Sequence, residues 1–189
     1  MRSFLRTLRL RSELLAISLI VLAVISRWLP HPPNMAPIAA MAIFSGLVLR
    51  QRWAVGVPLL ALFLSDLLIG FYGPTMLAVY GCFGVSFVIG RWASQKVSFM
   101  RLVLATLGSA SLFYLITNAA VWGFGTMYSH DLAGLGQAYL AAIPFFRNSL
   151  VGDLMYLGIF VSLWRLTGQT LTNTTARSLS KFGSAVQVS

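Results

Sequence analysis

The sequence has few charged residues, and acidic residues are the scarcest of them. Of 189 residues, 10% are charged, with four Asp or Glu against 14 Lys or Arg, while 58% are hydrophobic. This balance excludes a soluble domain. A formal net charge of +10 would favour nucleic acid as the partner of a soluble chain. Basic residues also gather on the cytoplasmic side of membrane proteins, however. The sequence therefore predicts an integral membrane protein in contact with the lipid bilayer, with no nucleic-acid partner.

Cysteine is almost absent, because Cys82 is the single one in the sequence. One cysteine excludes an intramolecular disulfide and multi-cysteine zinc or iron–sulfur sites. The sequence also lacks a Walker motif, a G-x-G-x-x-G after a strand, an H-E-x-x-H and paired carboxylates flanking a cleft. We therefore expect no ATP site in this chain, so energised transport would need another subunit.

Apolar runs long enough to cross about 30 Å of hydrocarbon occur six times. They predict an all-α protein with a single six-helix transmembrane domain over 1–168 and a mobile cytoplasmic tail over 169–189. No A-x-A cleavage site follows the first run, which predicts that it is retained as a helix. The expected spans are 13–29, 36–50, 53–71, 75–92, 101–122 and 145–166.

Basic residues alternate between the connections of these spans. The loops 30–35, 72–74 and 123–144 contain no Lys or Arg, whereas the two termini and the other connections are basic. Basic loops face the cytoplasm. Both termini are therefore predicted to be cytoplasmic.

Four polar residues lie within the expected spans, and the three charged ones have two interpretations. Charges at membrane depth usually face a cavity or a partner. In the first interpretation, Arg147 forms an internal ion pair with Asp66 or Asp153. In the second, Arg147 and Asp66 hydrogen-bond a polar ligand at the outer mouth. Asn118 is the fourth such residue.

The outer loops have the composition of lids. Pro32 and Pro33 hold the first loop semi-rigid, and the aromatic residues of the loops either stack on a ligand or anchor the chain at the membrane interface. His31 beside these prolines is either a surface histidine or a ligand-binding one.

Cys82 lies well inside the fourth span, between Gly81 and Gly84. The glycines leave the helix surface beside the sulfur bare, so that a flat ligand could approach a thiolate able to bind a soft metal. The alternative is that Cys82 packs as a small apolar side chain.

Five segments of the sequence together resemble the S components of energy-coupling-factor vitamin transporters. Within these, the sequence is most similar to the small solitary cobalamin transporters of Gram-negative bacteria, the BtuM type. The segments are HPPNMAPIAAMA at 31–42, LSD at 64–66, VYGC at 79–82, TN at 117–118 and IPFFRNSLVGD at 143–153.

The resemblance implies a six-helix fold, a pocket open to the periplasm and loops that close over bound cobalamin. It implies that Cys82 is an axial cobalt ligand that helps to remove cyanide from cyanocobalamin, with His31 as the opposite ligand or a guard of the mouth. It also implies an energy-coupling ATPase module as partner. Members that share such a module commonly have small residues four positions apart in the first span, and here only Ser12 and Ala16 have this spacing. The implied substrate-binding residues are His31, Asn34, Asp66, Tyr80, Phe83, Asn118 and Arg147.

Two rival hypotheses stay open from the sequence. A transporter of the same fold could carry another vitamin, with Cys82 as core packing. A structural or assembly protein of the membrane would bind no small molecule.

Overall fold

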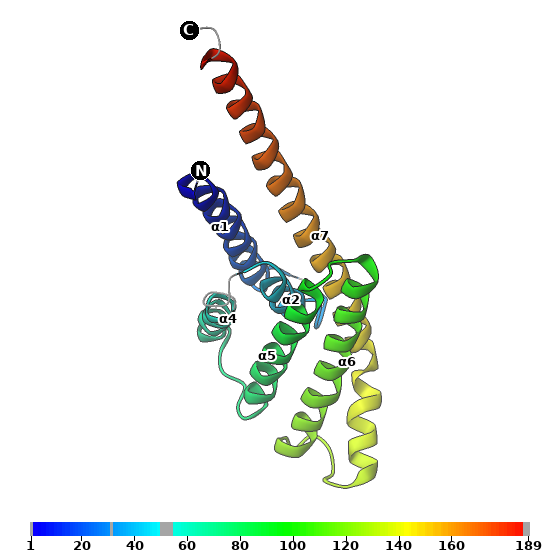
Figure 1. The fold of residues 1–189 in the computed structure, drawn as a ribbon. Helices are drawn as coiled ribbons and strands as arrows, with labels where there is room; N and C mark the ends of the chain where they lie inside the picture. The colour runs from blue at the N-terminus through cyan, green and yellow to red at the C-terminus, as the bar shows by residue number, and fades with distance from the viewer. Residues whose placement is uncertain (1, 31, 50–54, 187–189) are drawn as a thin grey trace.

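The fold is a bundle of helices (Figure 1). A computed structural model describes residues 2–30, 32–49 and 55–186, with side chains described between Glu13 and Thr167. In these ranges all regular structure is α-helical, and six helices are present. They are α1 (Arg2–Ser26), α2 (Ile38–Val48), α4 (Gly56–Ile69), α5 (Thr75–Ser94), α6 (Phe99–Phe124) and α7 (Leu132–Val186).

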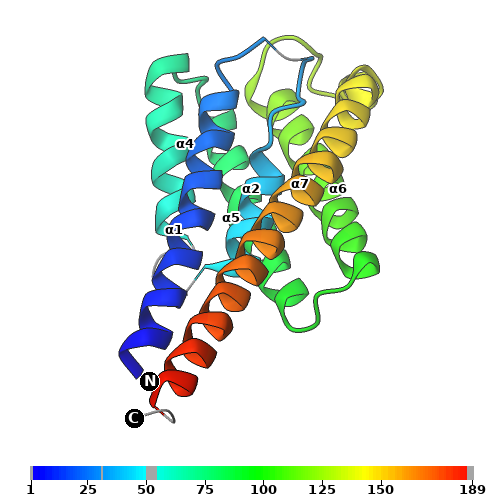
Figure 2. The same cartoon turned by 90° about the horizontal axis from the view of Figure 1, so that it is seen from above.

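Both chain ends lie at the same end of the bundle, as Figure 2 shows. The connections α1–α2, α4–α5 and α6–α7 lie at the opposite end. Apart from Arg27, which directly follows α1, these three connections contain no Lys or Arg, so the arrangement agrees with the alternation in the sequence. That the termini face the cytoplasm stays a prediction.

Three of the described helices could cross a membrane by length and composition, namely α5, α6 and the Leu132–Thr167 part of α7. The other three apolar helices are shorter than the spans expected from the sequence. The described apolar part of α1 is Glu13–Ser26, while α2 has 11 residues and α4 has 14. At 1.5 Å per residue, α2 is about 16 Å long, roughly half the hydrocarbon thickness. Six full-length spans are therefore not supported.

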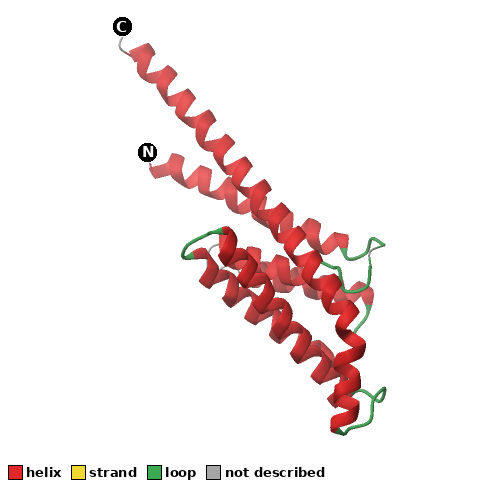
Figure 3. Cartoon of the chain, turned by 90° about the vertical axis from the view of Figure 1, so that its right-hand side faces the viewer, coloured by secondary structure: helices red, strands yellow, loops and turns green. Residues whose placement is uncertain are grey.

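Helix α7 differs most from the expected boundaries. It begins at Leu132, inside the expected loop 123–144, and it continues to Val186, past the expected start of the tail at 169. Asp131 caps its first turn, because Oδ1 accepts a hydrogen bond of 2.7 Å from the Gly134 N–H. Pro144 lies within the helix, and the yellow and orange parts of α7 run in different directions in Figure 1. Figure 3 shows the same change of direction in the long helix that leads to the C-terminus. Whether residues 169–189 are mobile stays a prediction.

Helix α2 lies at the centre of the bundle and is almost wholly buried, from Ala39 to Gly46. Two glycines bring it close to α5. A Cβ on Gly90 would lie 2.9 Å from the Ile43 Cα, and one on Gly46 would lie 2.9 Å from the Arg91 nitrogen. Small residues of this kind let two helix backbones approach closely.

The carbonyl end of α2 is capped by a side chain from α5. The Arg91 guanidinium donates to the Gly46 and Leu49 carbonyl oxygens at 3.4 Å each. A cation at a helix C-terminus satisfies unpaired carbonyls and interacts favourably with the helix dipole. Arg91 therefore stabilises the end of α2 that points toward the chain termini.

Candidate functional site

Two adjoining cavities lie at the end of the bundle opposite the termini. Cavity 1, of about 300 Å³, is lined by α2, α4, α6, α7 and the α1–α2 connection. Cavity 2, of about 360 Å³, is lined mainly by α5, α6 and α7. Both lie in the range of small-molecule sites. They share four lining residues, so they are neighbouring compartments of one region: Asn34, Ala110, Phe113 and Ser149.

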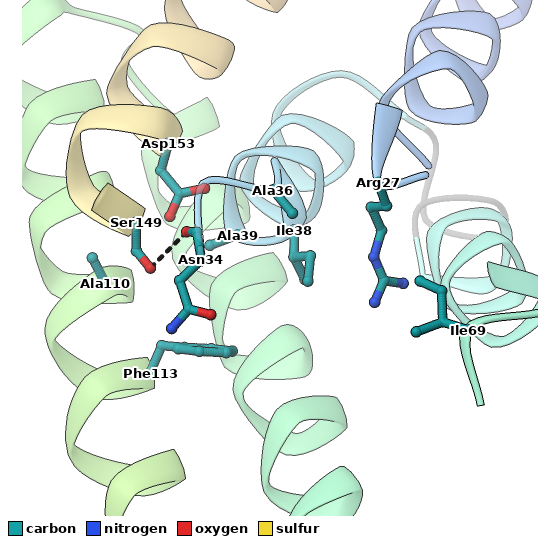
Figure 4. A pocket seen from close by; sticks show the side chains of 10 residues that line it. All are labelled: Arg27, Asn34, Ala36, Ile38, Ala39, Ile69, Ala110, Phe113, Ser149 and Asp153. Atoms are coloured by element: carbon teal, nitrogen blue, oxygen red, sulfur yellow. Dashed lines mark hydrogen bonds between the residues drawn. The ribbon is translucent and has the colours of Figure 1, made fainter. Parts of the chain in front are cut away.

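The walls of cavity 1 differ in polarity (Figure 4). Ser149 and Asp153 from α7 lie on one side, while Arg27 and Ile69 lie on the other. The Asn34 amide extends over the ring of Phe113 between them. Asn34 adopts a φ of 60°, which Asn tolerates better than most residues. The cavity thus combines an apolar interior with a few polar groups, as ligand sites generally do.

The α1–α2 loop is held against α7. Asn148 donates to the Pro33 carbonyl oxygen at 3.1 Å, and Ser149 donates to that of Asn34 at 2.9 Å. One turn on, a Cβ on Gly152 would lie 3.1 Å from the Met35 carbonyl oxygen, so the glycine permits close contact. These contacts make the described part of the loop a fixed wall of the cavity.

Asp153 caps the N-terminal end of α2 from the neighbouring helix. Its side chain is buried, with 4% of the residue exposed, and Oδ1 accepts a hydrogen bond of 2.9 Å from the Ala40 N–H. The partial positive charge of a helix N-terminus favours a carboxylate there. Oδ2 makes no hydrogen bond with any described residue, and Asp153 lines cavity 1.

Asp66 on α4 connects the residue that follows α1 to α5. It is fully buried and accepts from the Arg27 Nη2 at 2.9 Å and from the Tyr80 hydroxyl at 2.9 Å. The interpretation that Arg147 forms an ion pair with Asp66 or Asp153 is therefore wrong. Arg27 is the cation beside Asp66, and Asp153 accepts a hydrogen bond from a backbone N–H instead. Arg147 is exposed. The Arg27 Nη1 is buried without a partner among the described residues.

Tyr72 lies in the α4–α5 connection, between two glycines with positive φ, and lines cavity 2. Such φ values favour glycine. Partial burial and the nearby Asp66 carboxylate raise the pKa of Tyr72 to about 12. On the α6–α7 connection, the N–H of Gly134 and the Ser129 hydroxyl lower the pKa of Asp131 by hydrogen bonding to its carboxylate. Both tyrosine and aspartate thus keep their usual charge state at neutral pH.

The structure brings some of the expected substrate-binding residues together. Asn34 lines both cavities and Asn118 lines cavity 2, while Asp66 and Tyr80 hydrogen-bond each other but line neither cavity. Arg147 lines neither cavity, and His31 lies outside the described residues. Phe83, at 2% exposed, packs in the hydrophobic core.

Cys82 lies one helical turn below the cavities. It follows Val79, which lines cavity 2, by three residues on α5. The residue is 2% exposed and lines neither cavity. A Cβ on Gly81 or Gly84 would meet nothing within 4 Å, so bare helix surface does flank the cysteine. Among the described residues, no group of three or more His, Cys, Asp and Glu is placed to hold a metal ion.

Comparison with known proteins gives one match. A family model described as "Family of unknown function (DUF6580)" matches residues 8–176. The chain belongs to this family. The DUF6580 match includes every residue that lines the two cavities, together with Cys82. No curated protein and no solved structure matches the chain.

Sequence reasoning missed three residues that line cavity 1. Arg27, Phe113 and Ser149 are not among the substrate-binding residues that the sequence implied. A signal for Arg27 was present, since an arginine in an outer region that otherwise lacks basic residues needs an anionic partner. Phe113 offered no such signal, because an aromatic residue in an apolar span is ordinary.

Proposed function

We propose that this chain binds cobalamin within the inner membrane of a bacterium and takes it up from the periplasmic side. The observation that carries the proposal is the pair of adjoining cavities at the end opposite the termini. Asn34 and Asn118, which the resemblance implies as substrate-binding, line them. Asp66 and Tyr80 line neither cavity, but Asp66 pairs with Arg27, which lines cavity 1, and accepts from Tyr80. Residues from distant parts of the sequence therefore converge on one region.

Both termini are cytoplasmic in this proposal, and all six helices lie within the bilayer. Helices α5, α6 and α7 cross it, while the buried α2 needs no lipid contact along its length. An energy-coupling ATPase module is the proposed partner if uptake is energised, because the chain has no nucleotide motif of its own.

Cys82 is the proposed axial ligand of the cobalt. A corrinoid is larger than either cavity, so binding requires the two to join and to extend past Val79 toward the sulfur. There the thiol would replace cyanide on Co(III), forming a cobalt–sulfur bond while the thiol proton leaves with the cyanide as HCN. The bare surface beside Gly81 and Gly84 supports such an approach.

The test is the absorption spectrum of protein purified from cells fed cyanocobalamin, compared with Cys82→Ser. We expect bound corrinoid in both, with a shifted band and free cyanide only in the wild type. Corrinoid bound with identical spectra would remove the axial role of Cys82. Colourless preparations of both proteins would overturn the proposal for cobalamin altogether.

A second candidate is a transporter of a smaller vitamin, with Cys82 as core packing. The burial of Cys82 outside both cavities favours it. Each cavity volume alone also suits a ligand smaller than a corrinoid. In that case purified protein would carry a small ligand that mass spectrometry detects, and Cys82→Ser would bind it equally well.

A further inference from the structure

Asp153 is a buried carboxylate whose charge is only partly balanced by its surroundings. Arg27, on the far wall of cavity 1, is paired with Asp66, and Arg147 on the same helix is exposed. Helix α2 contains no ionisable residue, and α6 contributes Ala110 and Phe113 to the cavity. The compensation consists of the Ala40 N–H and the N-terminal dipole of α2.

The hydrogen bond to Ala40 uses one oxygen and leaves the other available. Oδ1 is taken by α2, whereas Oδ2 has no partner among the described residues. A carboxylate oxygen that borders a cavity can accept a hydrogen bond from whatever fills that cavity. Because Asp153 lines cavity 1, a ligand in that cavity can provide the missing donor.

We propose that Asp153 Oδ2 is a binding site for an N–H group of a small ligand in cavity 1, either an amide or an ammonium group. The ionised carboxylate repels an anionic group at this position. The apolar part of the ligand lies against Ile38 and Phe113, since an aromatic ring offers an extended flat face. The proposal rests on the ligand-binding role of the cavities, but it does not depend on the ligand being cobalamin.

Three probes share one ring and differ only in the polar group: benzamide, benzylamine and benzoate. Their size suits a cavity of about 300 Å³. Ligand-observed NMR on the full chain in detergent gives the affinity of each. We expect the wild type to bind benzamide or benzylamine at least about tenfold more tightly than benzoate, because a hydrogen bond to a charged acceptor contributes that much.

Asp153→Asn isolates the role of Oδ2. The asparagine oxygen can still accept from the Ala40 N–H, while the amide nitrogen now presents a donor to the cavity. We expect the variant to keep its melting temperature and to lose the preference for N–H probes. Asp131→Asn is the matched control, because Asp131 lines neither cavity, and it should bind as the wild type does.

The outcomes separate the two proposals. A wild type that binds benzoate best, binds no probe, or keeps its preference in Asp153→Asn overturns the assignment of Oδ2. If Asp153→Asn does not fold, the order of wild-type affinities still decides. The probes can also bind in a way that depends on Asp153 while the protein takes up no cobalamin. That result overturns the cobalamin proposal and leaves the assignment of Oδ2 intact.

Discussion

Asp153 on α7 accepts a hydrogen bond of 2.9 Å from the backbone N–H of Ala40, a residue 113 positions earlier in the chain. The contact joins the last described helix to the first turn of the central one. Arg91 on α5 holds the other end of α2. The central helix therefore depends on its neighbours for both of its caps.

Asp153→Ala should lower the stability of the protein. The substitution leaves the buried Ala40 N–H without a partner, at a cost of about 1 to 3 kcal/mol. Thermal unfolding in detergent measures the effect. Asp131→Ala is the comparison, since it also removes a helix cap but at an exposed site where water can replace the carboxylate. An equal effect of both substitutions would argue against the buried cap.

Gly90→Ala should destabilise the contact between α2 and α5. The added methyl group would meet the Ile43 backbone, and overpacking of this kind costs about 1 to 3 kcal/mol. Gly84→Ala on the same helix meets nothing within 4 Å and should raise stability by up to about 1 kcal/mol through helix propensity. Opposite shifts in the melting temperature are expected, and shifts of the same sign would contradict the close approach.

Arg27→Leu should be strongly destabilising, because it leaves the buried Asp66 carboxylate without its cation. Breaking a buried ion pair from one side costs about 3 to 5 kcal/mol. The double variant Arg27→Leu/Asp66→Leu should recover much of this loss, since no uncompensated charge is left. Arg147→Leu, at an exposed position, should change the melting temperature little. A larger effect for Arg147 than for Arg27 would restore the pairing first considered from the sequence.

Tyr72 should ionise late in an alkaline titration. Its pKa is raised to about 12 in the folded protein, against 10 in an unfolded chain. The contribution of Tyr72 to stability is therefore fully present below pH 10 and is lost as the pH rises toward 12. Ultraviolet difference titration of the wild type and Tyr72→Phe measures this, and the difference should appear near pH 12. A difference centred at pH 10 would show that Asp66 has no influence.

The sequence predicted the elements whose signals are local. The spans expected at 75–92 and 101–122 match α5 and α6 within a few residues, because both are long apolar runs between polar loops. The start of α7 was missed, although Asp131 three residues before Gly134 is an N-cap signal. The sequence analysis placed 123–144 in a loop, but α7 begins at Leu132 and continues through Pro144.

The candidate site was harder to predict because it depends on the register between helices. The sequence marked Asp66 and Tyr80 as polar positions, and the structure brings them within 2.9 Å. It did not indicate that Arg27 would be the cation beside Asp66, since the two lie 39 residues apart. The depth of Cys82 below the cavities likewise depends on how α5 packs against α2 and α6, which spacing along one helix does not determine.

The shortness of α2 has a consequence for permeation. Its first turn adjoins cavity 1 through Ile38 and Ala39, and its last residue leads to the connection at the other end of the bundle. If cavity 1 holds a solute in transit, as the proposed function requires, α2 is one of the helices that separate this solute from the other end of the bundle, and it has 11 residues. Because α2 is about 16 Å long, the proposed uptake would require this short helix to move.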